Sequence, residues 1–191
     1  MRMAARSCCP ERAAAGSHVR HVLPDVLVPG LRVVFCGTAA GAVAARVGAP
    51  YAGPGNRFWW VLHEVGLTPR ELAPAEFREL PRYGIGLTDV AKLASGSDAS
   101  LARTDFDPAA VIAKVERYAP AILACVGKRA AQEVLGGRVA YGRQHARIGR
   151  SDVWVVPSTS GAARGAWDLR PWQVLARAAA DQGSGRPSQS S

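Results

Sequence analysis

Apolar residues along the chain gather in short continuous runs that alternate with segments of helical periodicity. Four short runs predict β-strands, at residues 31–36, 84–88, 121–126 and 153–156. The first run is continuously apolar from Val33 and the third is apolar throughout, which is typical of strands buried on both faces. Strands that alternate with helices predict an α/β fold, in which helices cover both faces of a mostly parallel sheet.

Helices are predicted at residues 56–65, 69–80, 107–119, 127–135 and 168–180. Asn56, Thr68 and Asp107 are suited to cap the first three, because a short polar side chain accepts from the free amides of a first turn. The Ser-rich residues 92–104 predict a surface loop. The Gly- and Arg-rich residues 136–150 predict a hairpin or an edge strand.

The two ends of the chain show no sustained apolar period. Residues 1–21 are rich in Ala and Arg, and residues 182–191 are low in complexity, so we expect a disordered basic arm and a disordered tail. The remainder, residues 22–181, is long enough for one domain with a sizeable core and too short for two.

The chain is strongly basic, with 24 Lys and Arg against 15 Asp and Glu, a net charge of +9 and a pI of about 10.1. This balance favours a polyanionic partner, with nucleic acid first and a membrane surface second. The alternative is a generally Arg-rich composition whose charge is spread diffusely over the surface.

Four cysteines fit neither a disulfide framework nor a zinc pattern. Cys8 and Cys9 are adjacent in the arm, while Cys36 and Cys125 lie in apolar runs and are expected as buried thiols. We expect no metal or other cofactor. No stretch reaches the roughly 18 uninterrupted apolar residues of a membrane span, and the start lacks the apolar core of a secretory signal, so the cytoplasm is the expected compartment.

Parallel strands end at the same edge of a sheet, so four segments of this chain are expected to meet there. They are GTAAG at residues 37–41, LTD at 87–89, GKR at 127–129 and PSTSGAAR at 157–164. Together with Tyr51 they offer a carboxylate, two cations, hydroxyl clusters, backbone amides and an aromatic ring. Such a cleft in a basic protein suits an enzyme that handles one nucleobase extruded from DNA.

Five motifs in this order carry a specific resemblance: DVLVPGLRVVFCG, YAGPGNRFWWVLHEVGLTP, GIGLTD, LACVGKRA and VWVVPSTSGAAR. Over residues 24–180 the chain resembles the mismatch-specific uracil/thymine-DNA glycosylase family of the uracil-DNA glycosylase superfamily. The resemblance implies a compact three-layer α/β/α sandwich around a short, mostly parallel sheet. It also implies excision of uracil from DNA by a monomeric, nucleoid-associated enzyme without a cofactor.

The family's first motif, Gly-Ile-Asn-Pro-Gly, corresponds to the segment from Gly37 to Gly41. The family asparagine that positions the attacking water therefore falls on Ala39, which cannot do that work. The family aromatic that stacks on the flipped base falls on Tyr51, which retains the chemistry. Backbone amides of the segment, including those of Gly37 and Thr38, are expected to stabilise the leaving base.

Asp89 is the candidate to replace the missing asparagine. It follows a predicted strand and is expected to face the same cleft as Ala39. Hydrolysis of an N-glycosidic bond builds positive charge on the sugar, and a carboxylate can both deprotonate water and stabilise that cation. The alternative is a structural role for Asp89, as a helix cap or in a salt bridge to Lys92 or an arginine.

The remaining candidate residues are expected to bind the base or the DNA strand. Asn56 and Ser158 could reach the base, although helix capping alone also explains Asn56. The family's last motif assigns DNA contacts to Ser160, Gly161, Ala162 and Arg164, with Lys128 and Arg129 as further phosphate contacts. Ala162 replaces the family's wedge leucine, so single strands or weak mismatches are expected to be favoured.

Two other functions compete with a uracil-DNA glycosylase. A catalytically silent relative that binds damaged or single-stranded DNA would take Ala39 at face value and treat Asp89 as structural. A nucleotide hydrolase would rest on the Gly-Lys pair at 127–128, but the upstream glycine spacing and the following Ser or Thr of a phosphate loop are missing.

Overall fold

The computed structural model describes residues 21–161 and 167–184 of the chain. Their five strands form one sheet in the order β2-β1-β3-β5-β4. The strands are β1 (Val33–Ala40), β2 (Ile85–Ser95), β3 (Ile122–Val126), β4 (Gly142–Ile148) and β5 (Ser151–Val156). All neighbouring pairs are parallel except β4 with β5. The predicted mostly parallel sheet is confirmed, and the segment before β5 is its antiparallel edge strand.

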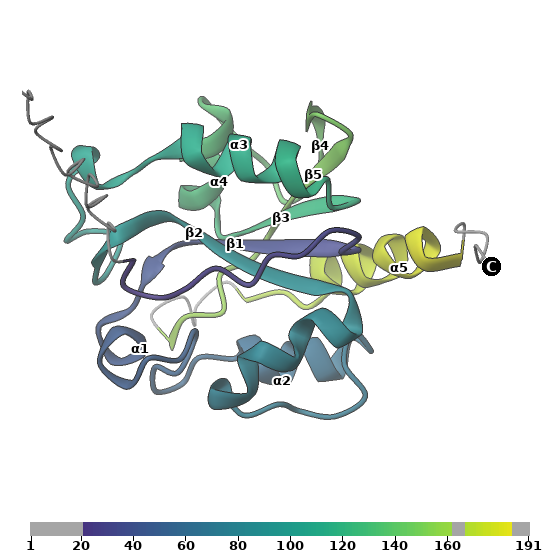
Figure 1. Cartoon of the computed structure of the whole chain (residues 1–191), viewed down its shortest axis with the longest axis horizontal. Coiled ribbons are helices and arrows are strands. Elements are labelled where there is room, and N and C mark those ends of the chain that lie inside the picture. Colours follow the sequence, from purple (N-terminus) through teal and green to yellow (C-terminus); the bar gives the residue numbers. More distant parts are fainter. Residues whose placement is uncertain (1–20, 162–166, 185–191) are drawn as a thin grey trace, which may run out of the picture.

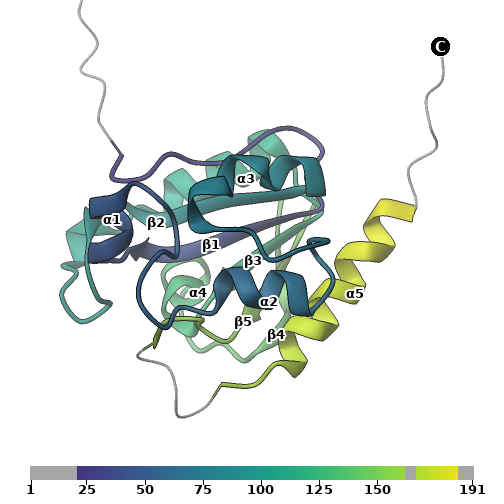
Figure 2. The same cartoon turned by 90° about the horizontal axis from the view of Figure 1, so that it is seen from below.

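Helices cover both faces of this sheet. The described helices are α1 (Ala42–Val47), α2 (Phe58–Glu64), α3 (Pro108–Tyr118), α4 (Lys128–Leu135), α5 (Arg170–Ser184) and the 3-10 helices η1 (Pro74–Tyr83) and η2 (Arg103–Asp105). In Figure 1, α3 and α4 lie above the sheet and α2 lies below it. Seen from below, α2 and α5 both lie on the side of the sheet that faces the viewer (Figure 2). The three-layer α/β/α architecture is therefore confirmed.

Side chains of successive strand residues point to opposite faces of the sheet, so the core has two halves, one on each face. Phe35 of β1 points to one side, where its ring centroid lies 5.4 Å from those of both Phe58 and Trp172. Val34, its neighbour along β1, belongs to the other half, together with Val111 of α3. All eight positions of β1 are at least partly buried, as expected for a central strand with helices on both faces.

The prediction of a helix at residues 69–80 is wrong. The Thr68 hydroxyl donates to the Arg70 carbonyl at 2.8 Å instead of capping a helix, and the helical segment begins only at Pro74. A proline in the interior of the expected helix would have removed a hydrogen bond and clashed with the preceding turn. Pro74 instead occupies the first position of η1, where its missing N–H has no cost.

The strand expected at residues 84–88 is longer, and part of the expected loop at 92–104 belongs to it. Strand β2 continues to Ser95, so Asp89 lies within the strand rather than beyond its end. The pairing of β1 with β2 shifts register after Ala39, where Ala40 pairs with Ser95. The intervening residues of β2 include Lys92, which is only 8% exposed and pairs with carboxylates.

A short helix that was not predicted, α1, follows Gly41. The capping prediction for Asp107 is confirmed, since its side chain accepts from the Ala110 amide at 2.9 Å. At the other end of the fold, α5 runs to Ser184, past the expected end at residue 180 and into the expected tail. No helix in the described part of the chain is long and apolar enough to cross a membrane.

Candidate active site

The predicted convergence of four segments is found in one cleft of about 670 Å³. Residues of β1, β2 and β3 line it, as do residues of the segment after β5 and of the loop that follows α1. Of the residues selected from the sequence, those that line it are Gly37, Thr38, Ala39, Tyr51, Asn56, Asp89, Lys128, Arg129, Ser158, Ser160 and Gly161. Ala162 and Arg164 lie outside the described residues.

Gly37, Asp89 and Tyr51 form the polar centre of the cleft. Gly37 on β1 is the in-register neighbour of Asp89 on β2. A Cβ atom added to Gly37 would lie 2.6 Å from Asp89 Oδ1 and 3.1 Å from the Tyr51 hydroxyl oxygen. The carboxylate and the phenol therefore converge on the space beside the Gly37 backbone, which only a residue without a side chain leaves open.

The Asp89 carboxylate is largely withdrawn from solvent, with 16% of its side chain exposed. Burial raises its pKa above the ordinary value, and nearby Lys92 opposes that rise without cancelling it. The Lys92 ammonium lies 3.5 Å from Asp89 Oδ2, so the salt bridge considered as an alternative is present as well. A buried carboxylate that faces a cleft and has a raised pKa has the properties of a general base.

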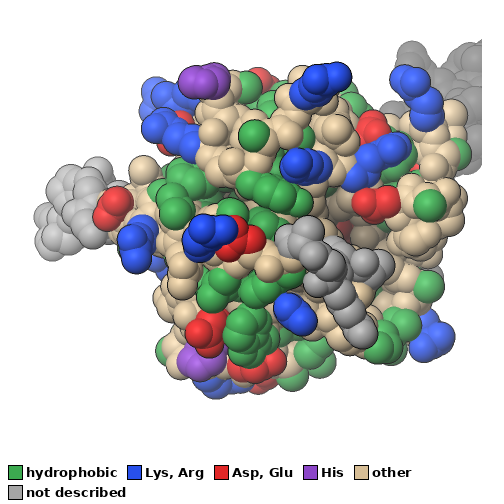
Figure 3. All heavy atoms as spheres, turned by 180° about the vertical axis from the view of Figure 1, so that it is seen from behind, with side chains coloured by type: hydrophobic (Ala, Val, Ile, Leu, Met, Phe, Trp, Pro, Cys, Tyr) green, Lys and Arg blue, Asp and Glu red, His purple; other side chains and the backbone are tan. Residues whose placement is uncertain are grey.

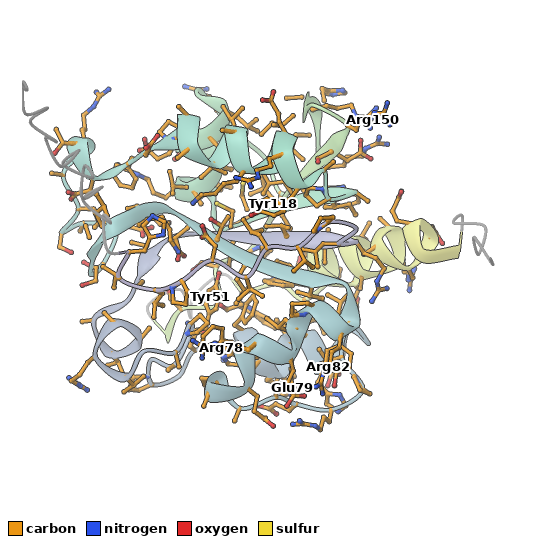
Figure 4. The ribbon with its side chains drawn as sticks, in the orientation of Figure 1. Tyr51, Arg78, Glu79, Arg82, Tyr118 and Arg150 are labelled. Carbon is orange, nitrogen blue, oxygen red and sulfur yellow. The ribbon has the colours of Figure 1, made fainter. Side chains whose placement is uncertain are left out.

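Tyr51 is held in an unfavourable backbone conformation. Its φ is +57°, in the left-handed region, which costs about 1–2 kcal/mol for a residue with a Cβ atom. Its ring stacks on Phe58, with 3.8 Å between centroids and 11° between planes, and it lies between the sheet and the α2 layer (Figure 4). Burial and the nearby Asp89 raise the Tyr51 pKa, so the hydroxyl remains a donor.

The Tyr51 hydroxyl is buried and has no hydrogen-bond partner among residues 21–161 and 167–184. A buried polar group without a partner is uncommon, and strained residues gather at functional sites. Both observations make Tyr51 a candidate for contact with a ligand, while its ring also packs against the core.

Two other predicted base-binding residues differ in what they can offer. Ala39 contributes only its methyl group to the cleft wall, two residues beyond Gly37 on β1. Asn56 lies just before α2, and its Oδ1 accepts from the Phe58 amide at 3.0 Å. Arg57 rather than Asn56 occupies the N-cap position of α2, so the predicted cap is displaced by one residue. The bond to Phe58 still occupies the Asn56 oxygen, and only its NH₂ group could serve a base.

Hydroxyl groups line the cleft at the end of β5. Ser158 Oγ donates to Ser160 Oγ at 3.2 Å, and the Ser160 amide donates to Ser158 Oγ at 3.4 Å. Gly127, at the end of β3, packs against Ser158, with the position of an added Cβ 3.4 Å from the serine Cβ. The two strand ends are thus in contact, as their parallel pairing requires.

The two predicted cations at the start of α4 are placed differently. Lys128 is exposed at the cleft, with its ammonium 4.8 Å from the Tyr141 ring centroid. Arg129 instead pairs with Glu133 at 2.9 Å, and its guanidinium lies 4.9 Å from the Phe106 ring centroid. Lys128 is therefore the better placed of the two to meet a phosphate.

Sequence reasoning missed several residues of the cleft wall, among them the polar or aromatic Ser97, Asp98 and Tyr141. Tyr141 is an exposed aromatic directly before β4, a signal that the predicted hairpin could have offered. Ser97 and Asp98 carried no signal, because they lie in a polar segment that resembles any solvated loop.

Charges of both signs are mixed on the face of the molecule shown in Figure 3. On the face shown in Figure 3, Lys and Arg side chains are scattered among acidic and apolar ones rather than gathered in one patch. This distribution agrees with the diffuse charge considered above and gives no separate basic footprint on that face.

Cys36 and Cys125 are confirmed as buried thiols on neighbouring strands. Burial raises the pKa of both, to about 12 for Cys125, so neither is a reactive thiolate. Within the described ranges, no group of three or more His, Cys, Asp or Glu side chains is arranged to hold a metal ion.

Comparison with known proteins agrees with this geometry. Residues 24–179 match the family model of the uracil DNA glycosylase superfamily. A similar solved structure is the solution NMR structure of a "putative Uracil DNA glycosylase" from Methanosarcina acetivorans, with a TM-score of 0.56 and 19% identity over 84% of this chain and 98% of that one. At that identity the likeness supports the fold alone. The family match covers most of the chain, which therefore belongs to the uracil DNA glycosylase superfamily.

Proposed function

We propose that this protein is a monofunctional uracil-DNA glycosylase of the mismatch-specific type, which hydrolyses the N-glycosidic bond of a deoxyuridine flipped out of DNA. The superfamily supports the class of reaction. The observation that carries the proposal is the buried Asp89 carboxylate beside Gly37 in a cleft that also holds Tyr51. That carboxylate offers the base that Ala39 lacks.

In the proposed reaction, Asp89 accepts a proton from a water molecule as the water oxygen bonds to C1′ of the deoxyribose. The C1′–N1 bond breaks, and its electron pair leaves with the base, which departs as an anion and is then protonated. Because the sugar gains positive charge before attack is complete, the negative carboxylate also stabilises the transition state. The products are uracil and an abasic site.

The leaving base carries developing negative charge, which preorganised donors stabilise most effectively. Gly37, Thr38, Ala39 and Ser158 line the same cleft, and in this proposal their backbone amides and the Ser158 hydroxyl are the donors. The neutral Tyr51 contributes a ring to stack on the base and a hydroxyl that can donate. Lys128 is placed at the exposed rim to hold a phosphate of the flipped nucleotide.

The test is a cleavage assay on end-labelled oligonucleotides that contain one uracil, in single strands and opposite A or G. Purified protein is expected to leave alkali-labile sites at the uracil and none in uracil-free controls. Strand cleavage before alkali treatment, or covalent trapping by borohydride, would contradict a monofunctional mechanism, because both require an enzyme amine bonded to C1′.

Absence of alkali-labile sites in every substrate, with enzyme in excess, would rule out the proposal. If the same protein then bound DNA tightly and in a salt-sensitive way, the catalytically silent relative would be favoured. Other deaminated bases in the same sequence context define the substrate range.

Tyr51 is expected to act mainly through its ring. Replacing Tyr51 by alanine should lower kcat/KM for uracil release by about 5- to 150-fold, because stacking on a base contributes about 1–3 kcal/mol. Tyr51→Phe keeps the ring and the Phe58 contact, and we expect about 10-fold or less from it. A larger loss in Tyr51→Phe than in Tyr51→Ala would contradict a stacking role and assign the function to the hydroxyl.

A further inference from the structure

Four charged side chains of alternating sign lie in a row behind the cleft. Lys92 Nζ is 3.5 Å from Asp89 Oδ2 and 3.0 Å from Asp25 Oδ1. Asp25 Oδ2 is in turn 2.7 Å from Lys114 Nζ. The row therefore runs from Asp89 through Lys92 and Asp25 to Lys114, and its formal charges cancel.

The members of the row come from three separate elements, and all are mostly buried. Asp25 lies in the segment before β1, Asp89 and Lys92 on β2, and Lys114 on α3. Lys92 is 8% exposed, Asp25 and Asp89 16% and Lys114 20%. Burying charges is costly, and even a well-paired buried ion pair often stabilises a fold no more than apolar residues would.

The backbone already fixes the segment before β1 without these ions. Val26 and Leu87 exchange two backbone hydrogen bonds of 2.9 Å, and the Val22 amide donates to the Lys92 carbonyl at 2.8 Å. The Thr88 hydroxyl adds a hydrogen bond of 2.8 Å to Asp25 Oδ1. A purpose beyond attachment of this segment is therefore indicated for the charged row.

We propose that Lys92 is a positioning residue for Asp89, and that Asp25 and Lys114 determine how much of its charge acts on the Asp89 carboxylate. This inference rests on the proposed function, in which Asp89 is the base. It extends that function to residues outside the cleft, since none of Asp25, Lys92 and Lys114 lines it.

The geometry separates the two oxygens of Asp89. Oδ2 faces the Lys92 ammonium, while Oδ1 is the atom nearest to the position of an added Gly37 Cβ. One oxygen is thus anchored from behind, and the other is turned toward Gly37 and Tyr51. An anchored carboxylate loses less freedom when it orients a water molecule, which is how positioning groups contribute to rate.

The charges of the row also affect the pKa of the Asp89 carboxyl group. The Asp89 pKa is raised by burial, lowered by the cations Lys92 and Lys114, and raised by the anion Asp25. Two other titratable groups, those of Tyr51 and Cys36, also interact with Asp89. Their own pKa values are raised, so they stay neutral. Lys92 therefore opposes the rise of the Asp89 pKa that burial causes, and Asp25 works against Lys92.

Two substitutions should move the pH dependence in opposite directions. Lys92→Met removes the cation, so the acidic limb of the single-turnover pH–rate profile should move up by about one pH unit or more. Asp25→Asn removes the competing anion but retains an oxygen for Thr88, so the same limb should move down. Arg82→Met, which removes an exposed cation on η1 (Figure 4), should leave the profile unchanged.

A direct measurement separates this inference from the proposed function. Titration of ¹³C-labelled aspartate carboxyl groups by NMR, with Asp89 assigned from Asp89→Asn, reports the Asp89 pKa without any turnover. Failure of the wild type to release uracil would remove the proposed function, while opposite shifts in Lys92→Met and Asp25→Asn would still establish the coupling. Unchanged Asp89 titration in folded Asp25→Asn, or a shift in the same direction in both variants, would overturn the inference. If Lys92→Met does not fold, Lys114→Met, with an upward shift expected, takes its place.

Discussion

Replacing Asp89 by asparagine is expected to lower the single-turnover rate of uracil release by about 10²- to 10⁴-fold, the usual contribution of a general base. Asparagine has nearly the same shape and can still orient a water molecule, but it cannot accept a proton or stabilise a cationic sugar. DNA binding should be retained, because Asp89 carries a negative charge and contributes no attraction to phosphate. Quench-flow measurement of product together with a binding titration separates the two steps.

Asp98 supplies the matched control for this change. Among the described residues that line the cleft, Asp89 and Asp98 are the two carboxylates, and Asp98 is exposed. Asp98→Asn makes the same chemical change at the rim, and we expect its rate to stay within about threefold of the wild type. A loss in Asp98→Asn comparable to that in Asp89→Asn would mean that the wrong carboxylate has been assigned.

A single methyl group at Gly37 is expected to lower the rate by about 10²-fold. The added Cβ would lie 2.6 Å from Asp89 Oδ1, closer than any normal contact, so the carboxylate must move. A displacement of about 1 Å at a reacting group can cost 10²-fold in rate. Uracil release by Gly37→Ala, measured under single-turnover conditions with a circular dichroism spectrum to verify folding, tests this expectation.

Gly53→Ala is the control for Gly37→Ala. It lies on the same cleft wall, but an added Cβ there has no atom within 4 Å among the described residues. We expect near-normal activity from it. Normal activity in Gly37→Ala as well would show that Asp89 does not need its present position, and would speak against its role as the base.

Most of the fold could be predicted from the sequence because its central strands are buried on both faces. Strands β3 and β5 carry continuous apolar runs, which leave few alternatives to a parallel sheet between helical layers. The helix α3 was equally clear, because Asp107 and Pro108 mark its start. In both cases the local sequence and the tertiary environment favour the same structure.

Elements were wrongly predicted where local signals and tertiary contacts disagree. Thr68 and Pro69 resemble a helix start, yet the Thr68 hydroxyl is used in a turn and η1 begins at Pro74. The polar residues at the end of β2 resemble a loop, yet pairing with β1 keeps them in the strand. A partner strand distant in sequence leaves no trace in a local pattern.

The candidate site was predictable in part. The convergence of strand ends follows from parallel topology, and it placed Asp89, Tyr51 and the Ser158 segment in one cleft. Of the charged row, only the Asp89–Lys92 pair could be predicted, since Asp25 and Lys114 lie far from Asp89 in sequence and each resembles an ordinary surface residue. Only the packing of three elements shows that Lys92 is buried between two carboxylates.

The in-register pairing of Gly37 with Asp89 has a consequence for how such enzymes diversify. By its resemblance to the mismatch-specific family, Ala39 on β1 is expected to stand where the family asparagine stands, whereas the Asp89 carboxylate projects from β2, the adjacent strand. Two adjacent parallel strands can therefore each carry a side chain into the same reaction centre. A catalytic group lost from one strand can be supplied by the other while the path of the backbone stays the same. Under the proposed function, loss of a signature residue in one motif does not by itself mark an inactive relative, because a neighbouring strand takes over its work.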